Sequence, residues 1–302
     1  MANLSRLILM VLFVVVGSGC KLVDSEKISG RSPLAPLDSA PNQIVLEIVF
    51  VRLVGPDAQI DPLLWDEIDE QSIAAVSRRQ FSRNGFRAGV LGNQLPPKLT
   101  ELAARVPLAD GTSASVPPDP ENTGATRHWM YLNPQQRGEL VTSSVHPEFH
   151  VLTWNRGELN GETFQDAQAQ FALMAAVEDD GRSRIKLYPE VHHGHFRQRY
   201  VRGEGMFRLD TSRKKEVFDA LLIEAMVNPG QIVIVSSDAK HRGSLGHRFF
   251  NERLGDKQTS KLLLIRWADT GQEAQSPFSV FASADVDDQA ESTDDSSGAD
   301  GR

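Results

Sequence analysis

The first part of the expected folded region alternates strongly apolar stretches with segments of helical periodicity. Ile44–Val54 carries apolar residues on both alternating faces around Glu47, which is typical of a strand buried on both sides. Phe86–Leu91 predicts a second strand. With helices between and after these strands, the order predicts an α/β module over residues 44–106.

Three helices are predicted in this module. Asp61-Pro62 marks a helix start, because a capping residue precedes a proline. Ser72 can cap a second helix, which Asn84-Gly85 ends. The apolar positions expected to face the core are Leu63, Leu64 and Ile68 in the first helix, Ile73, Val76 and Phe81 in the second, and Leu99, Leu102 and Val106 in the third.

The second part of the chain changes to a period of two with tight turns. Phe171, Leu173, Ala175 and Val177 share one face, Asp180-Gly181 marks a tight turn, and Ile185, Leu187 and Val191 resume the alternation on the returning strand. This pattern predicts a β-hairpin. Further strands are expected at Val217–Val227, Ile232–Ser236 and Leu262–Trp267, with Asn228-Pro229-Gly230 as the turn between the first two. Lys214–Val227 also fits helical spacing, but the turn that follows favours a strand. Residues 126–270 are therefore expected to form an antiparallel sheet or sandwich.

The predicted fold class is α+β, with an N-terminal α/β module followed by a β-rich antiparallel sheet or sandwich. Residues 107–125, with their proline cluster, are the expected linker or long loop between them. Residues 271–302 hold eight acidic residues and one basic residue among Ser, Asp and Gly, which predicts a disordered acidic C-terminal tail. This tail carries most of the chain's net charge of −8, so the folded part is close to neutral.

The most apolar stretch, Leu7–Val16, has the layout of a bacterial lipoprotein signal. It follows a basic residue, is too short to span a bilayer comfortably and leads through Gly17-Ser18-Gly19 to Cys20, the only cysteine. We expect residues 1–19 to be a signal peptide and the sulfur of Cys20 to be the site of lipid attachment. Residues 20–43, rich in Ser, Pro, Gly and charge, are expected to form a flexible tether.

Two alternatives stay open for this segment. Gly17 stands where a lipobox usually has leucine, so ordinary secretion would leave Cys20 as a free thiol. An uncleaved anchor would need a longer apolar run. With Cys20 lipidated, no cysteine remains for a disulfide, so the fold must depend on its core. Lys21 is not the acidic residue that retains lipoproteins in the inner membrane, which favours the outer membrane, facing the periplasm or the exterior.

A cluster of titratable side chains spans residues 190–195. Side chains two apart on a strand share a face, so Glu190 pairs with His192, and His193 pairs with His195. Either pair could supply two ligands to a divalent metal such as zinc. A polar strand end with solvated histidines competes with this interpretation. Four other histidines could join the cluster only in three dimensions: His146, His150, His241 and His247.

Positive charge is concentrated in the stretch after this cluster. The candidate anion-binding residues are Arg197, Arg199 and Arg202. Because the export signal argues against nucleic acid as a partner, the expected ligands are anionic envelope polymers or lipid headgroups, which the forked donors of arginine suit. Acidic residues interleave with the basic ones, and this also fits a salt-bridged, solvated sheet face.

Three segments resemble the core domain of bacterial secretins. Ile44–Val51, with a glutamate among apolar residues, resembles the strand that opens that core. Tyr188-Pro189-Glu190-Val191 and Pro229-Gly230-Gln231-Ile232-Val233-Ile234 look like its later strands and its Gly-Gln turn. The resemblance covers roughly residues 44–236 and departs at Val235-Ser236-Ser237, where secretins have Gly-Gly-Leu. It implies an envelope protein that pairs β-edges, as an accessory or a non-porous relative of secretin-type complexes.

Together these features predict a lipid-anchored envelope protein that acts by binding or assembly and not by catalysis, without a cofactor. The expected partners are the membrane, through the N-terminal lipid, and an envelope protein complex or a homo-oligomer. The alternative is a metal-binding protein or a metal-dependent hydrolase that uses His192, His193 and His195.

Overall fold

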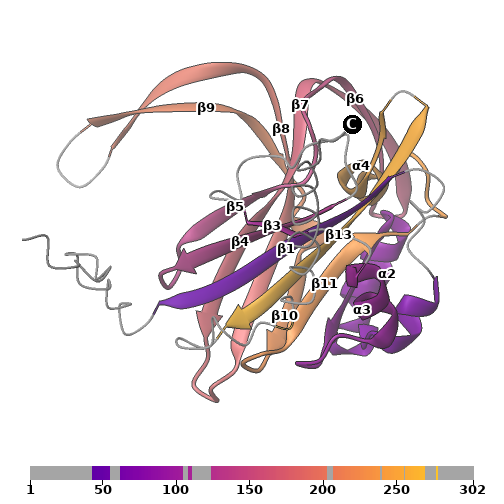
Figure 1. The fold of residues 1–302 in the computed structure, drawn as a ribbon. Helices are drawn as coiled ribbons and strands as arrows, with labels where there is room; N and C mark the ends of the chain where they lie inside the picture. Colours follow the sequence, from indigo (N-terminus) through magenta and orange to yellow (C-terminus); the bar gives the residue numbers. More distant parts are fainter. Residues whose placement is uncertain are drawn as a thin grey trace, which may run out of the picture. The chain divides into compact units, whose positions relative to one another are not determined.

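The computed structural model describes residues 43–54, 62–104, 108–110, 124–202, 207–238, 240–254 and 256–268, together with Pro277. The predicted signal peptide, Cys20, the tether apart from Gln43 and the acidic tail apart from Pro277 lie outside the described residues. The described part has an α+β fold, built mostly from antiparallel β-sheets with a few short helices (Figure 1).

Seven of the described strands form one sheet, sheet A: β1 (Ile44–Val54), β2 (Phe86–Leu91), β3 (Leu108–Asp110), β4 (Gly124–Leu132), β11 (Ile232–Ser237), β12 (Asn251–Leu254) and β13 (Lys257–Ala268). Their order is β2, β11, β13, β1, β4 and β3, and β12 pairs with the first residues of β13. All these pairs are antiparallel except β3 with β4. Strands from the beginning and the end of the described chain therefore share one sheet.

Six described strands form sheet B: β5 (Arg137–Val141), β6 (His146–Asn155), β7 (Glu158–Val177), β8 (Ser183–Arg202), β9 (Phe207–Val217) and β10 (Ile223–Val227). The long strands β7 and β8 form its centre. β5 and β10 pair with the halves next to the β7–β8 turn, and β6 and β9 pair with the other halves. The predicted hairpin is confirmed, with Gly181 at its turn adopting a φ of 80°.

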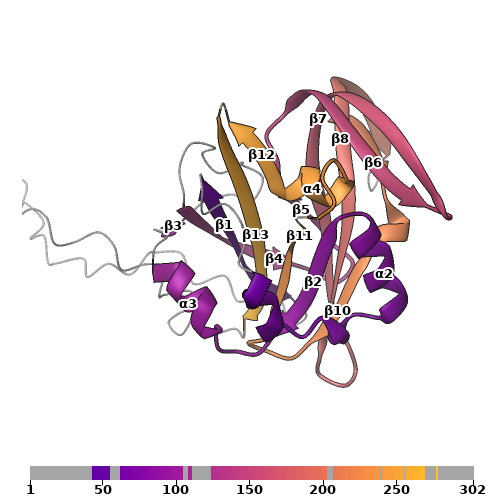
Figure 2. The ribbon, with the colours of Figure 1, turned by 90° about the vertical axis from the view of Figure 1, so that its right-hand side faces the viewer.

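Short helices accompany the sheets: η2 (Pro62–Glu67), η3 (Glu70–Ser72), α2 (Ala75–Arg83), α3 (Pro97–Ala104), η4 (Asp219–Leu221) and α4 (Leu245–Phe250) (Figure 2). One apolar core lies between the two sheets, and a second lies between the other face of sheet A and the helices η2 and α3. β1 supplies Ile48 and Phe50 to the first core and Val49 and Val51 to the second. It is thus buried on both sides, as its pattern predicts.

The predicted cap of the second helix is wrong. Ser72 ends η3, and α2 begins after Ala74, whose side chain has no hydrogen bond to the helix. Val76 is 66% exposed, so it faces solvent and not the core. The predicted cap residue, Ser72, belongs to the separate helix η3, so α2 begins at Ala75 and not directly after this cap. The predicted end at Asn84-Gly85 is confirmed, since Gly85 follows the helix with a φ of 75°.

The predicted strand over Val217–Val227 is interrupted. β9 ends at Val217 and β10 begins at Ile223, and both lie along the same side of β8. The interruption lies beside Pro189, whose backbone nitrogen cannot donate to a neighbouring strand. Pro189 instead accepts a hydrogen bond of 3.0 Å from the amide of Phe218, and η4 takes up the extra residues.

Two further predictions concern connections. The turn at Asn228-Pro229-Gly230 is present, but it leads from sheet B into sheet A and does not close a hairpin. Part of the predicted linker, residues 107–125, is structured, because Leu108–Asp110 forms β3 and β4 begins at Gly124. β11 pairs with β2 and β13, which are distant in sequence, and β3 pairs with the next strand, β4, so local turn signals show neither pairing.

Candidate functional site

The predicted histidines and arginines lie on the half of β8 that pairs with β9. The β8–β9 register shifts between His193 and Arg197, and Gly194 has a φ of 73°. Such a bulge bends a strand and changes its twist. Beyond it, residues 194–202 and 207–213 continue as a two-stranded arm, called the β8–β9 arm below (Figure 1).

Glu190 and His192 share a face and contact each other, as predicted. His192 Nε2 lies 3.1 Å from Glu190 Oε2 and 2.7 Å from the side-chain amide of Gln170. Arg137 on β5 donates to the same carboxylate. Burial raises the pKa of Glu190, but the hydrogen bonds from His192 and Arg137 outweigh this and hold the pKa below its ordinary value. The carboxylate therefore forms an ion pair between strands.

His193 and His195 are not brought together with this pair. The ring of His193 packs on Phe164, with 4.9 Å between the ring centres, and burial lowers the pKa of His193. The side chain of His195 is 95% exposed. In the described part of the chain, no group of three or more His, Cys, Asp or Glu side chains could hold a metal ion. The geometry therefore gives no support to a metal centre here.

Among the described residues, the remaining histidines also join no group that could hold a metal ion. Three of them have a carboxylate neighbour: His146 lies 3.6 Å from Glu252, His150 lies 3.4 Å from Glu148, and His241 lies 3.4 Å from Asp238. His247 belongs to a different surface, at the end of sheet A. The fold therefore does not join these four histidines to the cluster at residues 190–195 in a metal-binding group.

The β8–β9 arm carries exposed apolar side chains. Phe196 is 65% exposed, Tyr200 is 75% exposed and Leu209 is 47% exposed. Tyr200 and Leu209 are direct cross-strand partners, and Phe196 is four residues before Tyr200, a spacing that favours one face. Exposed large apolar groups that gather in this way mark a contact surface more often than isolated ones do.

Positively charged side chains lie on the same arm. The guanidinium of Arg213 lies over the ring of Phe196, 4.6 Å from its centre. Arg197 is exposed beside Phe196, and Lys214 and Lys215 are exposed where β9 meets the bulge. Of the predicted anion-binding residues, Arg199 and Arg202 also lie on the arm strand, but their side chains are outside the described part. The arm thus combines aromatic groups with cations.

The outer edge of β9 has no neighbour among the described strands, because β9 pairs only with β8 there. An edge strand presents unpaired backbone donors and acceptors to solvent or to a partner. The lysines on β9 are the kind of residue that discourages uncontrolled pairing at such an edge. In the described structure the edge of β9 is therefore free to pair with another strand, while its lysines oppose uncontrolled pairing.

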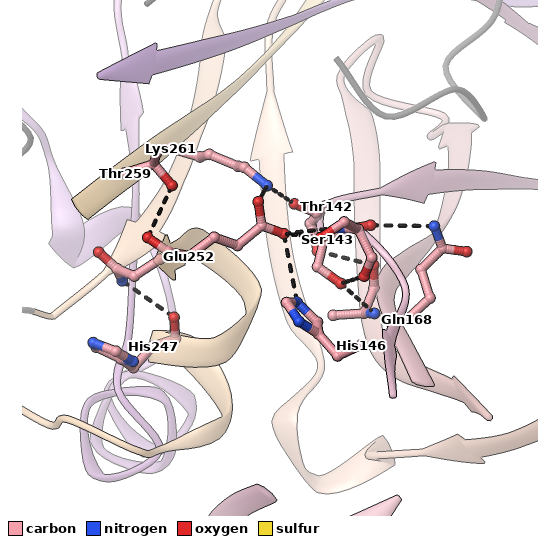
Figure 3. Close-up of polar contacts among 11 residues, drawn as sticks. Thr142, Ser143, His146, Gln168, His247, Glu252, Thr259 and Lys261 are labelled. Carbon is pink, nitrogen blue, oxygen red and sulfur yellow. Dashed lines mark hydrogen bonds and ion pairs between the residues drawn. The ribbon is translucent and has the colours of Figure 1, made fainter. Parts of the chain in front are cut away.

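A buried polar cluster that the sequence did not predict links the two sheets. Figure 3 shows Glu252 of β12 between Lys261 of β13 and the segment that follows β5. Lys261 Nζ donates to the Thr142 carbonyl oxygen at 2.5 Å and lies 3.0 Å from Glu252 Oε2. Glu252 Oε1 in turn accepts from the Ser144 amide at 2.7 Å. These contacts join sheet A to sheet B.

The electrostatics of this cluster follow from its burial. The side chain of Lys261 is 2% exposed, and this desolvation lowers the pKa of Lys261 to about 8 although Glu252 opposes the shift. Burial raises the pKa of Glu252, but His146 and Lys261 outweigh it and hold that pKa well below its ordinary value. The enclosed ammonium and carboxylate serve as a link between sheets. The only signal in the sequence was a lysine directly before the apolar run Leu262–Ile265.

The glutamate that carried the resemblance to secretins is also a buried, ion-paired residue. Glu47 Oε2 accepts from Arg266 Nε at 2.6 Å, and Glu47 Oε1 lies 3.8 Å from Arg127 Nη1. Both arginines come from strands that flank β1 in sheet A. This charged residue is therefore explained by pairing within the sheet.

The chain matches no family model, and searches of curated proteins and of solved structures return no match. Within the described residues, no helix combines the length and the apolar character needed to cross a membrane. Any assignment of function has to come from the chain's own surfaces.

Proposed function

We propose that this chain is a lipid-anchored protein of the bacterial cell envelope that acts by binding, and that the β8–β9 arm is its contact surface for anionic lipid headgroups. The observation that carries the proposal is the arm itself, where exposed Phe196, Tyr200 and Leu209 lie among arginines and lysines. Aromatic side chains at the headgroup level and cations that attract anionic lipids are the usual means of contact with a membrane surface.

The sequence supplies the second part of the argument. Cys20, at the end of a lipoprotein-like signal, would hold the chain at a membrane through its lipid. A flexible tether over residues 20–43 would span about 25–30 Å on average and at most about 80 Å. A second, electrostatic contact through the arm would add to the attachment that the lipid provides and would orient the folded part at the same membrane. The outer membrane stays the favoured location.

The anchor is tested by fractionating cells that express wild type or Cys20→Ala. We expect less of the variant in the membrane fraction and no lipid-dependent processing of its signal peptide, because the thiol that carries the lipid is gone. A Cys20→Ala protein that is processed and membrane-bound to the same extent as wild type would remove the support for lipidation.

The arm is tested separately, with full-length mature chain carrying Cys20→Ala so that no lipid contributes. Flotation with vesicles that contain phosphatidylglycerol should show binding, and vesicles of pure phosphatidylcholine should show much less. Phe196→Ser with Arg197→Gln should weaken binding about tenfold or more, since each basic residue near the surface contributes about 1 kcal/mol.

A matched control uses the end of the β6–β7 hairpin, where Leu159 at the start of β7 is 60% exposed and Arg156 in the turn is also exposed. Leu159→Ser with Arg156→Gln removes the same kinds of group and should leave vesicle binding unchanged. Equal losses in the two double variants, or equal binding to both vesicle types, would contradict a role for the arm.

Assembly through strand addition is the second candidate, favoured by the unpaired outer edge of β9. It agrees with the β-edge pairing that the secretin resemblance implies. Native mass spectrometry of protein extracted gently from its membrane distinguishes the two. A ring or another higher oligomer would favour assembly, and a lipidated monomer would favour membrane contact alone.

A further inference from the structure

A pocket of about 650 Å³ lies at one end of sheet A, away from the β8–β9 arm. Its walls come from α2, β2, the connection between β11 and α4, α4 itself and the paired ends of β12 and β13. Figure 2 shows α2, β2, α4 and β12 gathered on this side. The volume is within the range of small-molecule sites and far above the space that one water or one inorganic anion needs.

The walls are held together by backbone hydrogen bonds. The amides of Asp238 and Gly246 donate to the carbonyl oxygens of Gly85 and Asn84, at 2.9 Å and 2.8 Å. A Cβ on Gly246 would meet the Gly85 oxygen at 2.2 Å, so only glycine permits this approach. The buried Asn84 side chain also accepts from the Trp154 amide at 2.7 Å. The pocket is therefore formed before any ligand arrives.

The lining has an excess of positive charge. Five arginine and lysine side chains and two carboxylates border the pocket. Of the carboxylates, Glu70 is engaged by Arg87 at 2.7 Å, and Asp238 accepts the Lys240 amide at 3.0 Å. The four other cations make no ion pair with any residue in the described ranges: Arg78, Arg79, Lys240 and Arg242.

Two buried nitrogens at the pocket also lack partners within the described part of the chain. Arg78 Nε and His247 Nδ1 are both buried and have no hydrogen-bond partner among the described atoms. Burial and the nearby guanidiniums of Arg248 and Arg242 lower the pKa of His247. A positive local potential of this kind favours an anion.

The remaining polar lining consists of neutral hydrogen-bonding groups. Asn251 Nδ2 donates to Ser237 Oγ at 2.6 Å, and Ser260 Oγ donates to Asn251 Oδ1 at 2.5 Å. Gln258 and Ser82 also border the pocket. Hydroxyl and amide groups in this number suit a ligand that carries several hydroxyls, since each can donate and accept.

We propose that this pocket binds a phosphate group on a hydroxyl-rich carrier, of the class of a sugar phosphate. The phosphate lies among Arg78, Lys240 and Arg242, where forked and point-like donors face an anion. The carrier contacts the Ser237, Asn251 and Ser260 side. The inference is independent of the proposed membrane contact, because it uses none of the arm residues.

Isothermal titration of the full mature chain with glucose 6-phosphate, inorganic phosphate and glucose tests this proposal. Glucose 6-phosphate should bind more tightly than either other probe, and added salt should weaken it. Arg78→Gln with Arg242→Gln should reduce the affinity about tenfold or more, because a hydrogen bond to a charged group is among the stronger polar contacts.

The control double variant, Arg156→Gln with Arg253→Gln, removes the same charge from exposed positions outside the lining and should bind like wild type. An NMR titration of His247 gives a second readout, since a bound phosphate should raise the pKa of this imidazole. Absence of glucose 6-phosphate binding, equal affinity for inorganic phosphate, or equal losses in both double variants would overturn the proposal.

Discussion

The Glu252–Lys261 cluster buries charged side chains, whereas the β8–β9 arm exposes apolar ones. In the cluster, charged side chains are enclosed, and each is held by named partners from the other sheet. On the arm, aromatic side chains are exposed among cations, and a strand edge has no neighbour in the described structure. Both features depart from the usual placement of residue types.

The difference indicates that the cluster serves stability and that the arm serves contact with a partner. Removing a partner from an enclosed ion pair leaves a desolvated charge, so the fold itself depends on the cluster. Removing an exposed aromatic group from the arm leaves the core unchanged, so we expect its main effect on contacts with a partner and not on stability. Each region predicts a distinct response to substitution.

The largest effect is expected for Glu252→Gln. The substitution leaves the Lys261 ammonium buried without its carboxylate, so the free energy of unfolding should fall by about 3–5 kcal/mol. Urea unfolding followed by circular dichroism measures the change. Glu148→Gln, on an exposed glutamate, should change stability by less than about 0.5 kcal/mol. A loss below about 1 kcal/mol at Glu252 would contradict the structural importance of the pair.

A smaller effect is expected from pH. The pKa of Lys261 falls from 10.5 to about 8 on folding, so between these values the unfolded chain holds a proton that the folded chain has released. Stability rises with pH wherever the unfolded state binds more protons. The free energy of unfolding should therefore rise by about 2–3 kcal/mol from pH 8 to pH 10 through this residue.

The matched variant for this measurement is Lys261→Met, which should lack the rise because the titrating group is gone. Unfolding curves at several pH values for the two proteins, each referred to its own value at pH 7, give the difference. Parallel curves across the window would show that Lys261 keeps an ordinary pKa.

Patterns that depend on neighbours in sequence were predicted well. The β7–β8 hairpin follows from apolar positions two apart on both sides of Asp180-Gly181, and the two-sided burial of β1 follows from apolar residues on both of its faces. The corner at Asn84-Gly85 follows from the capping preference of glycine. In each case the residues that carry the signal also make the structure.

Features that join distant segments were not predicted. β1 lies between β4 and β13, and the Lys261–Thr142 contact links residues far apart in the sequence. Residue types alone also suggested a metal site at residues 190–195, but Glu190 is paired with Arg137, the His193 ring packs on Phe164 and His195 is exposed. The pocket's cations come from helix, strand and loop, so no local motif marks them.

The smallest effect on stability is expected on the arm. Tyr200→Ser with Leu209→Ser removes two exposed partners from the end of a sheet, so the free energy of unfolding should change by less than about 0.5 kcal/mol. Vesicle binding should fall in the same protein, because the apolar part of the contact is lost. A loss of stability above about 1 kcal/mol would mean that these side chains pack within the chain. The arm would then be a structural feature, like the Glu252–Lys261 cluster, and the proposed membrane contact would lose the observation that supports it.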